Sequence, residues 1–564
     1  MSIRSTSGRI ARRDLMKGLA ALPLTSAYAG FGNKLTSAEF SHGVASGDPM
    51  PDRVILWTRA VPINKGEKKV FVSWELARDV DFSSVVSTGM AATDAARDFT
   101  IKVDANGLEG ATDYFYRFRS DTSVSPTGQT KTLPTGKTEI ARLAIVSCAN
   151  MPLGYFNVYQ SLAERSDIDV VLHLGDYIYE YPRDKYGAAS IEEAGRIIAP
   201  EGEAISLSDY RQRYASYRLD PDLQAVHARH PFIAIWDDHD SANNSWRDGA
   251  KNHSPDEGEW LDRKAASQQA WIEWLPIRET GLTTSGQIYR AFDFGDLARL
   301  IMLDTRLIGR DQQLQYGRDL QFDFSANSEG NEQLAEVFRK DKLFAENRSM
   351  LGPEQEAWLD SQIAASARQG QTWQLLGQQV VMGNIQVPQF DPDWLDPGMK
   401  AWPEQEGKNM MSELVRLGLP TNLDAWSGYP AARQRLLGSI ENKAGNAIIL
   451  SGDSHNAWAC ALPGSEGTVA VEFAAQSVTS NGLEVHLPFN QEKIAESFVK
   501  ENSELFWADT HHRGYLTVTL THERAYAEWW IVDTVRKRQF SAIQAHGLMV
   551  SATEGKGSGL IEAD

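Results

Sequence analysis

Short apolar runs separated by helical segments constrain this chain more than any other feature of its sequence. Five runs have the composition of buried strands, at residues 143–147, 170–174, 232–236, 300–303 and 447–451. Amphipathic helices are predicted at residues 209–227, 263–274 and 353–365, the last with a proline in its first turn. Compact strands that alternate with helices are typical of a layered α/β domain.

The region before this domain has a different pattern. From about residue 40 to residue 132, short runs alternate apolar and polar residues at period two, as at residues 53–59, 69–75 and 113–118. Gly, Asp and Pro turns separate the runs, which predicts a small all-β sandwich over residues 38–133. Residues 133–138, which contain Pro and Gly, have the composition of a linker. We expect the α/β domain to span residues 138–548 and a flexible tail rich in Gly, Ser and Glu to follow at residues 551–564.

The first 29 residues have the order of an export signal. Arg12 and Arg13 precede an apolar run that is too short to cross a bilayer, and small residues at 27–29 offer a cleavage site. The paired arginines resemble a twin-arginine signal, although an ordinary exposed basic N-terminus is the alternative. We therefore expect residues 1–29 to be a signal peptide, the translocation machinery to be a partner, and the mature chain to be periplasmic or secreted. No other apolar run reaches the length of a membrane span, so no transmembrane segment is expected in the mature chain.

The charge balance narrows the range of partners. The formal net charge of −19 makes nucleic acid an improbable stable partner, because a long polyanion would meet a repulsive average field. A small phosphorylated substrate remains compatible with this charge, since bound cations dominate the field inside a site. The sequence leaves the oligomeric state open.

Metal-ligating residue types follow four of the five predicted strands. In an open α/β sheet the carboxyl ends of the strands gather at one edge, so these side chains should converge. Carboxylates and amides suit hard divalent cations, whereas a thiolate, a phenolate and an imidazole suit a transition metal such as ferric iron. The candidate residues are Cys148 after the first strand, Asp176 and Tyr179 after the second, Asp237, Asp238, His239 and Asn244 after the third, and Asp453 and His455 after the last.

Each candidate also has a purely structural interpretation. Cys148 could fill the core or form a disulfide with Cys460, the only other cysteine, and the aspartates could be turn residues. Asn244 could cap a helix. The spacing of the whole set favours ligation over these coincidences. His511 and His512 are interpreted as surface or pocket-rim residues rather than as ligands.

Several spaced motifs resemble a known family. Gly175-Asp176 with Tyr179, Asp238-His239 and Asp453-Ser454-His455 look like the motifs of calcineurin-like and purple acid phosphatases. The closer resemblance is to PhoD-type alkaline phosphatases (the alkaline phosphatase D family), and it covers residues 40–545. It rests on Ser46-Gly47-Asp48-Pro49, Ser147-Cys148, Trp236-Asp237-Asp238-His239-Asp240, Gly452-Asp453-Ser454-His455-Asn456-Ala457-Trp458 and Glu528-Trp529-Trp530.

The resemblance implies a metallophosphoesterase sandwich fold and a division of roles. Cys148, Asp176, Tyr179 and His455 would surround iron (Fe³⁺), with Asp176 as a bridge. Asp238, Asp453 and Asn244 would hold calcium (Ca²⁺), with other divalent metals as an alternative. Asp237 would be a ligand or a partner of a ligand, and His239 would face the phosphate as the catalytic residue. This chain departs from the family at Gln378, where asparagine is expected, and at Asp240, where glutamate is usual.

The expected activity is metal-dependent hydrolysis of phosphomonoesters or phosphodiesters. Metals would lower the pKa of a bound water, which attacks phosphorus in line, while His239 assists the leaving group. Two alternatives stay open: a phospholipase D-like phosphodiesterase, and a calcium-stabilised extracellular binding protein with structural metals.

Overall fold

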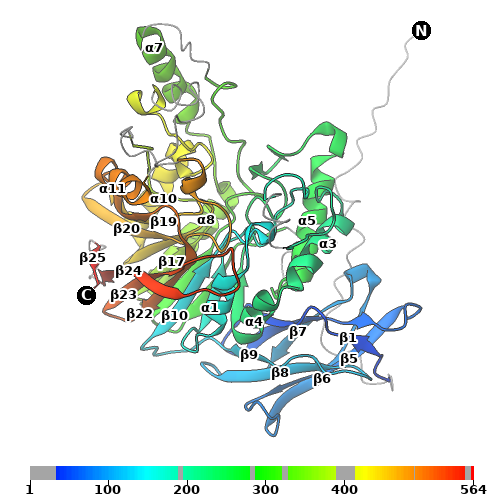
Figure 1. Cartoon of the computed structure of the whole chain (residues 1–564). Helices are drawn as coiled ribbons and strands as arrows, with labels where there is room; N and C mark the ends of the chain where they lie inside the picture. The colour runs from blue at the N-terminus through cyan, green and yellow to red at the C-terminus, as the bar shows by residue number, and fades with distance from the viewer. Residues whose placement is uncertain are drawn as a thin grey trace, which may run out of the picture.

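The structure is a computed structural model that describes residues 34–187, 195–279, 286–320, 328–388, 413–487, 490–552 and 560–563. Two large sheets, of ten and seven strands, form its centre, and a smaller four-stranded sheet lies at one end (Figure 1). The predicted signal peptide at residues 1–29 lies outside the described residues.

Three parallel strands form the middle of the ten-stranded sheet. They are β10 (Ala141–Val146), β11 (Val170–His173) and β12 (Pro231–Ala234), which confirms the first three predicted strands to within two residues. Beyond β10 the sheet continues antiparallel through β22 (Arg513–Leu520), β23 (Arg524–Val532), β24 (Ala542–Ser551) and β25 (Ile561–Glu562). Because β25 pairs with β24, the predicted flexible tail is wrong for its last described residues; residues 553–559 lie outside the description.

The seven-stranded sheet has the order β15-β16-β17-β18-β20-β19-β21 and is parallel from β16 to β20. Alternate residues on its central strands face different cores: Leu300, Leu375 and Ile448 pack between the two large sheets, while their successors face the covering helices. The strands are β15 (Arg290–Phe294), β16 (Ala298–Met302), β17 (Trp373–Gly377), β18 (Ala447–Ser451), β19 (Ala457–Gly464), β20 (Gly467–Ala474) and β21 (Leu505–Asp509).

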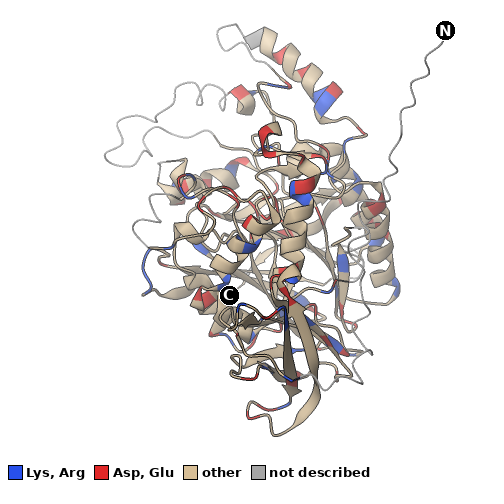
Figure 2. Ribbon diagram, turned by 90° about the vertical axis from the view of Figure 1, so that its right-hand side faces the viewer, with Lys and Arg blue, Asp and Glu red and all other residues tan. Residues whose placement is uncertain are grey.

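Helices cover the outer faces of both large sheets (Figure 1). Those that contribute to the core around the ten-stranded sheet are α1 (Asn157–Ala163), α3 (Leu207–Arg218), α4 (Pro221–Arg229) and α5 (Trp260–Trp274). Those packed on the seven-stranded sheet are α8 (Pro353–Arg368), α10 (Pro430–Lys443) and α11 (Gln491–Glu501). The fold is therefore the predicted α/β sandwich. Helix α7 (Ser328–Phe338) lies away from the sheets (Figures 1 and 2).

The prediction of one continuous helix over residues 209–227 is wrong, because two helices, α3 and α4, occupy this stretch. Pro221 has no N–H to continue α3, and the Asp220 side chain caps α4 by accepting from the N–H groups of Asp222 (2.9 Å) and Leu223 (3.1 Å). The other two predicted helices are confirmed as α5 and α8.

The N-terminal region is a β-sandwich that shares a sheet with the α/β domain. One sheet has the order β6-β5-β8-β9, and the facing strands β2, β3 and β7 extend the ten-stranded sheet past β12. Gly47 of β2 lies beside Phe232 of β12, and an added Cβ there would lie 2.5 Å from the Phe232 carbonyl oxygen. The strands are β2 (Val44–Gly47), β3 (Arg53–Arg59), β5 (Lys69–Ala77), β6 (Val85–Asp94), β7 (Thr100–Asn106), β8 (Asp113–Arg119) and β9 (Gly128–Lys131), and two small ribbons pair β1 (Ala38–Glu39) with β4 (Val61–Pro62) and β13 (Ser245–Trp246) with β14 (Gly249–Ala250).

Two surface properties bear on partners. Acidic and basic residues are spread over many elements rather than gathered on one (Figure 2). Within the described residues, no helix combines the length and apolarity that a bilayer crossing requires.

Candidate metal centre

Five predicted site residues have a left-handed backbone conformation. They make up half of the ten described non-glycine residues with positive φ. Such strained conformations persist only where the surrounding structure supports them, and they cluster at functional sites. The five are Cys148 (φ 61°), Asp176 (φ 53°), Asn244 (φ 50°), Asp453 (φ 59°) and His455 (φ 63°).

The glycines of the two Gly-Asp pairs let the strand ends approach each other. A Cβ on Gly175 would lie 2.3 Å from the Asp237 Cβ, and one on Gly452 would lie 2.6 Å from the Ser147 hydroxyl oxygen. The loop after β11 therefore lies against the loop after β12, and the loop after β18 lies against the end of β10. The aspartates that follow the two glycines are brought together from both large sheets.

Cys148, Asp176, Tyr179 and His455 form the sulfur-containing half of the centre. The ligand atoms of Cys148, Asp176 and His455 all lie within 4.8 Å of one another. The Tyr179 hydroxyl donates to Asp176 Oδ2 at 2.9 Å and lies 3.3 Å from His455 Nε2. His455 Nδ1 donates to the Asn481 carbonyl at 2.6 Å, which leaves Nε2 facing the cluster.

Burial makes this half unfavourable for negative charge. It raises the pKa of the Cys148 thiol well above its usual value, and the charge of Asp176 raises it further. The pKa of Asp176 is also raised by burial, against the opposing effect of His239. Metal ligands bind in their deprotonated forms. Because burial disfavours a thiolate and a carboxylate here, these charged groups need a cation beside them.

Asp237, Asp238 and Asp453 form the carboxylate half, with ligand atoms again within 4.8 Å of one another. A fully buried arginine, Arg306, lies among them and was missed by sequence reasoning. Its guanidinium donates to Asp237 through Nε and to Asp453 Oδ1 at 2.7 Å, and it lies 3.9 Å from Asp238 Oδ1.

A fourth acidic residue, Asp424, joins this network from outside the predicted set. Arg306 also donates to Asp424 Oδ2 at 2.6 Å, and Arg310 donates to the other oxygen of that carboxylate at 2.6 Å. Arg306 and Arg310 lie in the loop after β16, the predicted strand to which no candidate ligand was assigned. That position was the signal that could have revealed them.

The carboxyl groups of Asp237, Asp238 and Asp453 all lie near Arg306 but differ in pKa. Although burial opposes it, Arg306 together with His239 holds the pKa of Asp238 well below its usual range. Burial raises the pKa of Asp453 to about 6 in spite of Arg306. Burial also raises the pKa of Asp237, whose Oδ2 is buried with no hydrogen-bond partner in the described structure.

His239 lies between the two halves and is held by Glu180, which sequence reasoning also missed. Its ligand nitrogen lies within 4.8 Å of carboxylate oxygens of Asp176 and Asp238. His239 Nδ1 lies 2.7 Å from the fully buried Glu180 Oε2. Burial alone would lower the pKa of His239, but the carboxylates of Glu180, Asp238 and Asp176 together raise it well above its usual value.

The remaining predicted residue, Asn244, lies beside Asp238. Its backbone N–H donates to Asp238 Oδ2 at 2.6 Å. Asp240 is held by its own hydrogen bonds: its Oδ2 accepts from the Asp237 N–H at 2.9 Å and its Oδ1 from the Tyr214 hydroxyl at 3.3 Å. The Gln379 side chain links the loops after β16 and β12. Its Oε1 accepts from the Thr305 N–H at 3.1 Å, and its Nε2 donates to the Trp236 carbonyl at 2.7 Å.

Both cysteines are free and buried, so the alternative of a Cys148–Cys460 disulfide is not realised. The Cys148 thiol therefore remains available as a donor.

The sulfur-containing half fits an iron-type ion better than the carboxylate half fits calcium. Sulfur, phenol, imidazole and carboxylate in the sulfur-containing half are the donors that suit an iron-type ion. The carboxylate half offers the oxygen donors that calcium prefers, but Arg306 already forms hydrogen bonds to two of its three carboxylates and lies 3.9 Å from the third.

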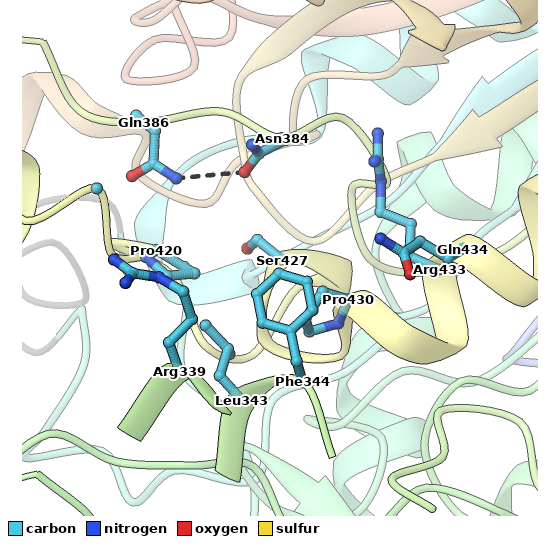
Figure 3. A pocket seen from close by; sticks show the side chains of 11 residues that line it. Arg339, Leu343, Phe344, Asn384, Gln386, Pro420, Ser427, Pro430, Arg433 and Gln434 are labelled. Carbon is cyan, nitrogen blue, oxygen red and sulfur yellow. Dashed lines mark hydrogen bonds between the residues drawn. The ribbon is translucent and has the colours of Figure 1, made fainter. Parts of the chain in front are cut away.

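A cavity of about 280 Å³ lies apart from this centre (Figure 3). Its lining includes Arg339, Phe344, Asn384, Gln386 and Arg433, and none of the predicted site residues belongs to it. Gln386 donates to Asn384 Oδ1 at 3.2 Å across one side of the cavity (Figure 3).

Comparisons find similar proteins over most of the chain. The family model described as PhoD-like phosphatase matches residues 143–529, and that of its N-terminal domain matches residues 25–134. Alkaline phosphatase D of Bacillus subtilis (strain 168) is 33% identical over 521 residues, which cover 89% of this chain and 79% of the relative. The solved structure of PhoD superposes with a TM-score of 0.73 at 28% identity, over 94% of this chain and 93% of the other.

Proposed function

Because the chain belongs to the PhoD-like phosphatase family and is therefore a phosphoester hydrolase, we propose that its hydrolysis is metal-dependent and takes place outside the cytoplasm. One observation carries the proposal. Cys148, Asp176 and His455, from loops of both large sheets, place a thiol, a carboxylate and an imidazole within 4.8 Å of one another, with the first two residues buried and His455 partly buried.

The sulfur-containing half is assigned to an iron-type ion, with Cys148, Asp176, Tyr179 and His455 as ligands. The carboxylate half, with Asp238, Asp453 and Asn244, is assigned to calcium or another divalent ion, and Asp237 to the support of Arg306. Bound cations of this kind supply Lewis acidity: they lower the pKa of water and neutralise the oxygens of the phosphate.

The side chains of the protein prepare and hold this arrangement. The Ser480 hydroxyl donates to the Tyr179 oxygen at 2.7 Å, and the Asn481 carbonyl fixes the His455 ring, so both donors are oriented before any ion binds. Glu180 holds His239 in its charged form. His239 is therefore assigned the role of contacting the phosphate and of giving a proton from Nε2 to the leaving alkoxide.

The proposal is tested with Asp176→Asn. We expect the variant to lose iron-type metal and to hydrolyse chromogenic phosphomonoesters and phosphodiesters about 10³-fold more slowly, equivalent to roughly 4 kcal/mol of transition-state stabilisation. Chelator should inactivate the parent to a similar extent. Asp167→Asn, in a surface pair with Arg165, is the matched control and should keep metal and activity. Parental metal content and turnover in Asp176→Asn would overturn the assignment.

Export is tested separately. Replacing Arg12 and Arg13 by lysine should leave the folded, active enzyme in the cytoplasm if the pair is a twin-arginine signal. Undiminished export of that variant would show that another route carries the chain.

A further inference from the structure

A second group of metal-ligating side chains lies outside the centre described above. Asp509 ends β21, and His511 and His512 follow in the turn to β22. Ligand atoms of these three side chains all lie within 4.8 Å of one another. All three are partly buried, and none belongs to either half of the metal centre.

The two imidazoles converge on one carboxylate. His512 Nδ1 lies 2.7 Å from Asp509 Oδ2, and His511 Nδ1 lies 3.4 Å from Asp509 Oδ1. The ring centroids of the two histidines are 3.9 Å apart. The two rings therefore lie side by side at the same carboxylate.

A turn-stabilising role for Asp509 accounts for only part of the geometry. Asp509 Oδ1 accepts from the backbone N–H groups of His511 and His512, both at 3.1 Å, which explains the position of the carboxylate. It does not explain His511, whose Nδ1 is buried and has no hydrogen-bond partner in the described structure.

A second orphaned atom lies in the same neighbourhood. Glu484 pairs through Oε1 with Arg513, the residue after His512, but its Oε2 is buried and also lacks a hydrogen-bond partner. The charge of Glu484 acts to raise the pKa of both His511 and His512. Buried polar atoms are normally satisfied, and an ion is one of the usual reasons when protein partners are missing.

We propose that Asp509, His511 and His512 bind a divalent transition-metal ion of the zinc class, at a site separate from the metal centre. Two imidazoles and one carboxylate are a donor set that such ions favour, with a fourth position left for water or Glu484. His511 and His512 are about one-third exposed, so the ion exchanges with solvent. This proposal differs from the interpretation of His511 and His512 as surface or pocket-rim residues.

The site has a short structural connection to the metal centre. Asn481 holds the His455 ring, and Glu484, three residues later, pairs with Arg513 beside the proposed ligands. An ion on Asp509, His511 and His512 therefore lies next to the segment that orients a proposed iron ligand.

The test uses the full chain with its own metals loaded, titrated with Zn²⁺ and, in parallel, with Co²⁺. We expect one additional equivalent by calorimetry, and for Co²⁺ a visible absorption band of imidazole-coordinated ion. Replacing both His511 and His512 by alanine should remove the additional equivalent, and Asp509→Asn should weaken it at least tenfold. His522→Ala is the matched control, because His522 is a single, similarly exposed histidine beside one aspartate, Asp296.

Two outcomes overturn the proposal: retention of the additional equivalent in the double histidine variant, or no cobalt band with the parent protein. Because the cobalt spectrum is measured on the parent, a variant that fails to fold does not prevent a decision. Asp176→Asn separates this proposal from the proposed function, since it should lose iron-type metal yet keep the additional zinc equivalent.

Discussion

The two halves of the metal centre balance their charge in different ways. In the carboxylate half, Arg306 pairs with Asp237 and Asp453, and Arg310 supports the same network through Asp424. In the sulfur-containing half, no described ion pair joins Cys148, Asp176 or Tyr179 to a lysine or arginine; the cationic neighbour is His239, which Glu180 also shares. The carboxylate half thus contains a permanent internal cation, whereas the sulfur-containing half depends on protons or on a metal ion.

This difference predicts different consequences of metal removal. Without metal, the sulfur-containing half can protonate, because burial has raised the pKa values of Cys148 and Asp176. In the carboxylate half, Arg306 holds the pKa of Asp238 low, so that this carboxylate stays charged, whereas burial raises the pKa of Asp237 and Asp453. Substitutions in the two halves should therefore affect the metal-free and metal-loaded proteins to different extents.

The largest effect is expected for Arg306→Met. Removing one partner of a buried ion pair leaves uncompensated charge, which costs about 3–5 kcal/mol. We expect that loss in the free energy of unfolding, measured by denaturant titration in chelator, and partial recovery on adding Ca²⁺, which can take the place of the guanidinium charge.

Arg299→Met is the matched control, because Arg299 pairs with the more exposed Asp293. Its cost should be about 1 kcal/mol or less and independent of calcium. Equal calcium responses of Arg306→Met, Arg299→Met and the parent would contradict the view that Arg306 acts as an internal cation.

An intermediate effect is expected where the halves meet, for Glu180→Gln. The amide cannot balance the charge of His239, so kcat/KM should fall about 10- to 100-fold, or roughly 1.4–2.8 kcal/mol. The decrease should be larger for esters of poorly leaving alcohols than for nitrophenyl esters, because proton donation matters most for a poor leaving group.

Glu203→Gln provides the control, since it removes a carboxylate from Arg263 outside the centre. A uniform decrease for good and poor leaving groups in Glu180→Gln would assign Glu180 to structural support alone.

The sequence was sufficient for the parts of this site that depend on strand ends. The carboxyl ends of β10, β11, β12 and β18 were recognisable as apolar runs followed by candidate ligands. The structure brings Cys148, Asp176 and His455 into one group and Asp237, Asp238 and Asp453 into another. Arg306 was missed because arginine is not a metal ligand, although it follows β16 in the same way.

Other features depend on long-range pairing that local patterns do not encode. Glu180 stands within the stretch after β11, but only the fold shows that it faces His239 rather than solvent. The continuity of the N-terminal sandwich with the ten-stranded sheet rests on the parallel pairing of Ser46 with Pro231 and of Gly47 with Phe232. The break at Pro221, in contrast, was readable from the sequence and was overlooked.

The smallest effect in the metal-free protein is expected for Tyr179→Phe, and it sharpens the contrast with Arg306. The substitution removes a hydroxyl that donates to Asp176 and accepts from Ser480, which should cost about 1 kcal/mol of unfolding free energy in chelator. In the metal-loaded protein the loss should be larger, because one proposed iron ligand is missing and iron content falls. Denaturation of both forms, with iron measured in each, gives the comparison. Equal losses with and without metal would make Tyr179 a hydrogen-bonding residue only and would leave the sulfur-containing half with three donors.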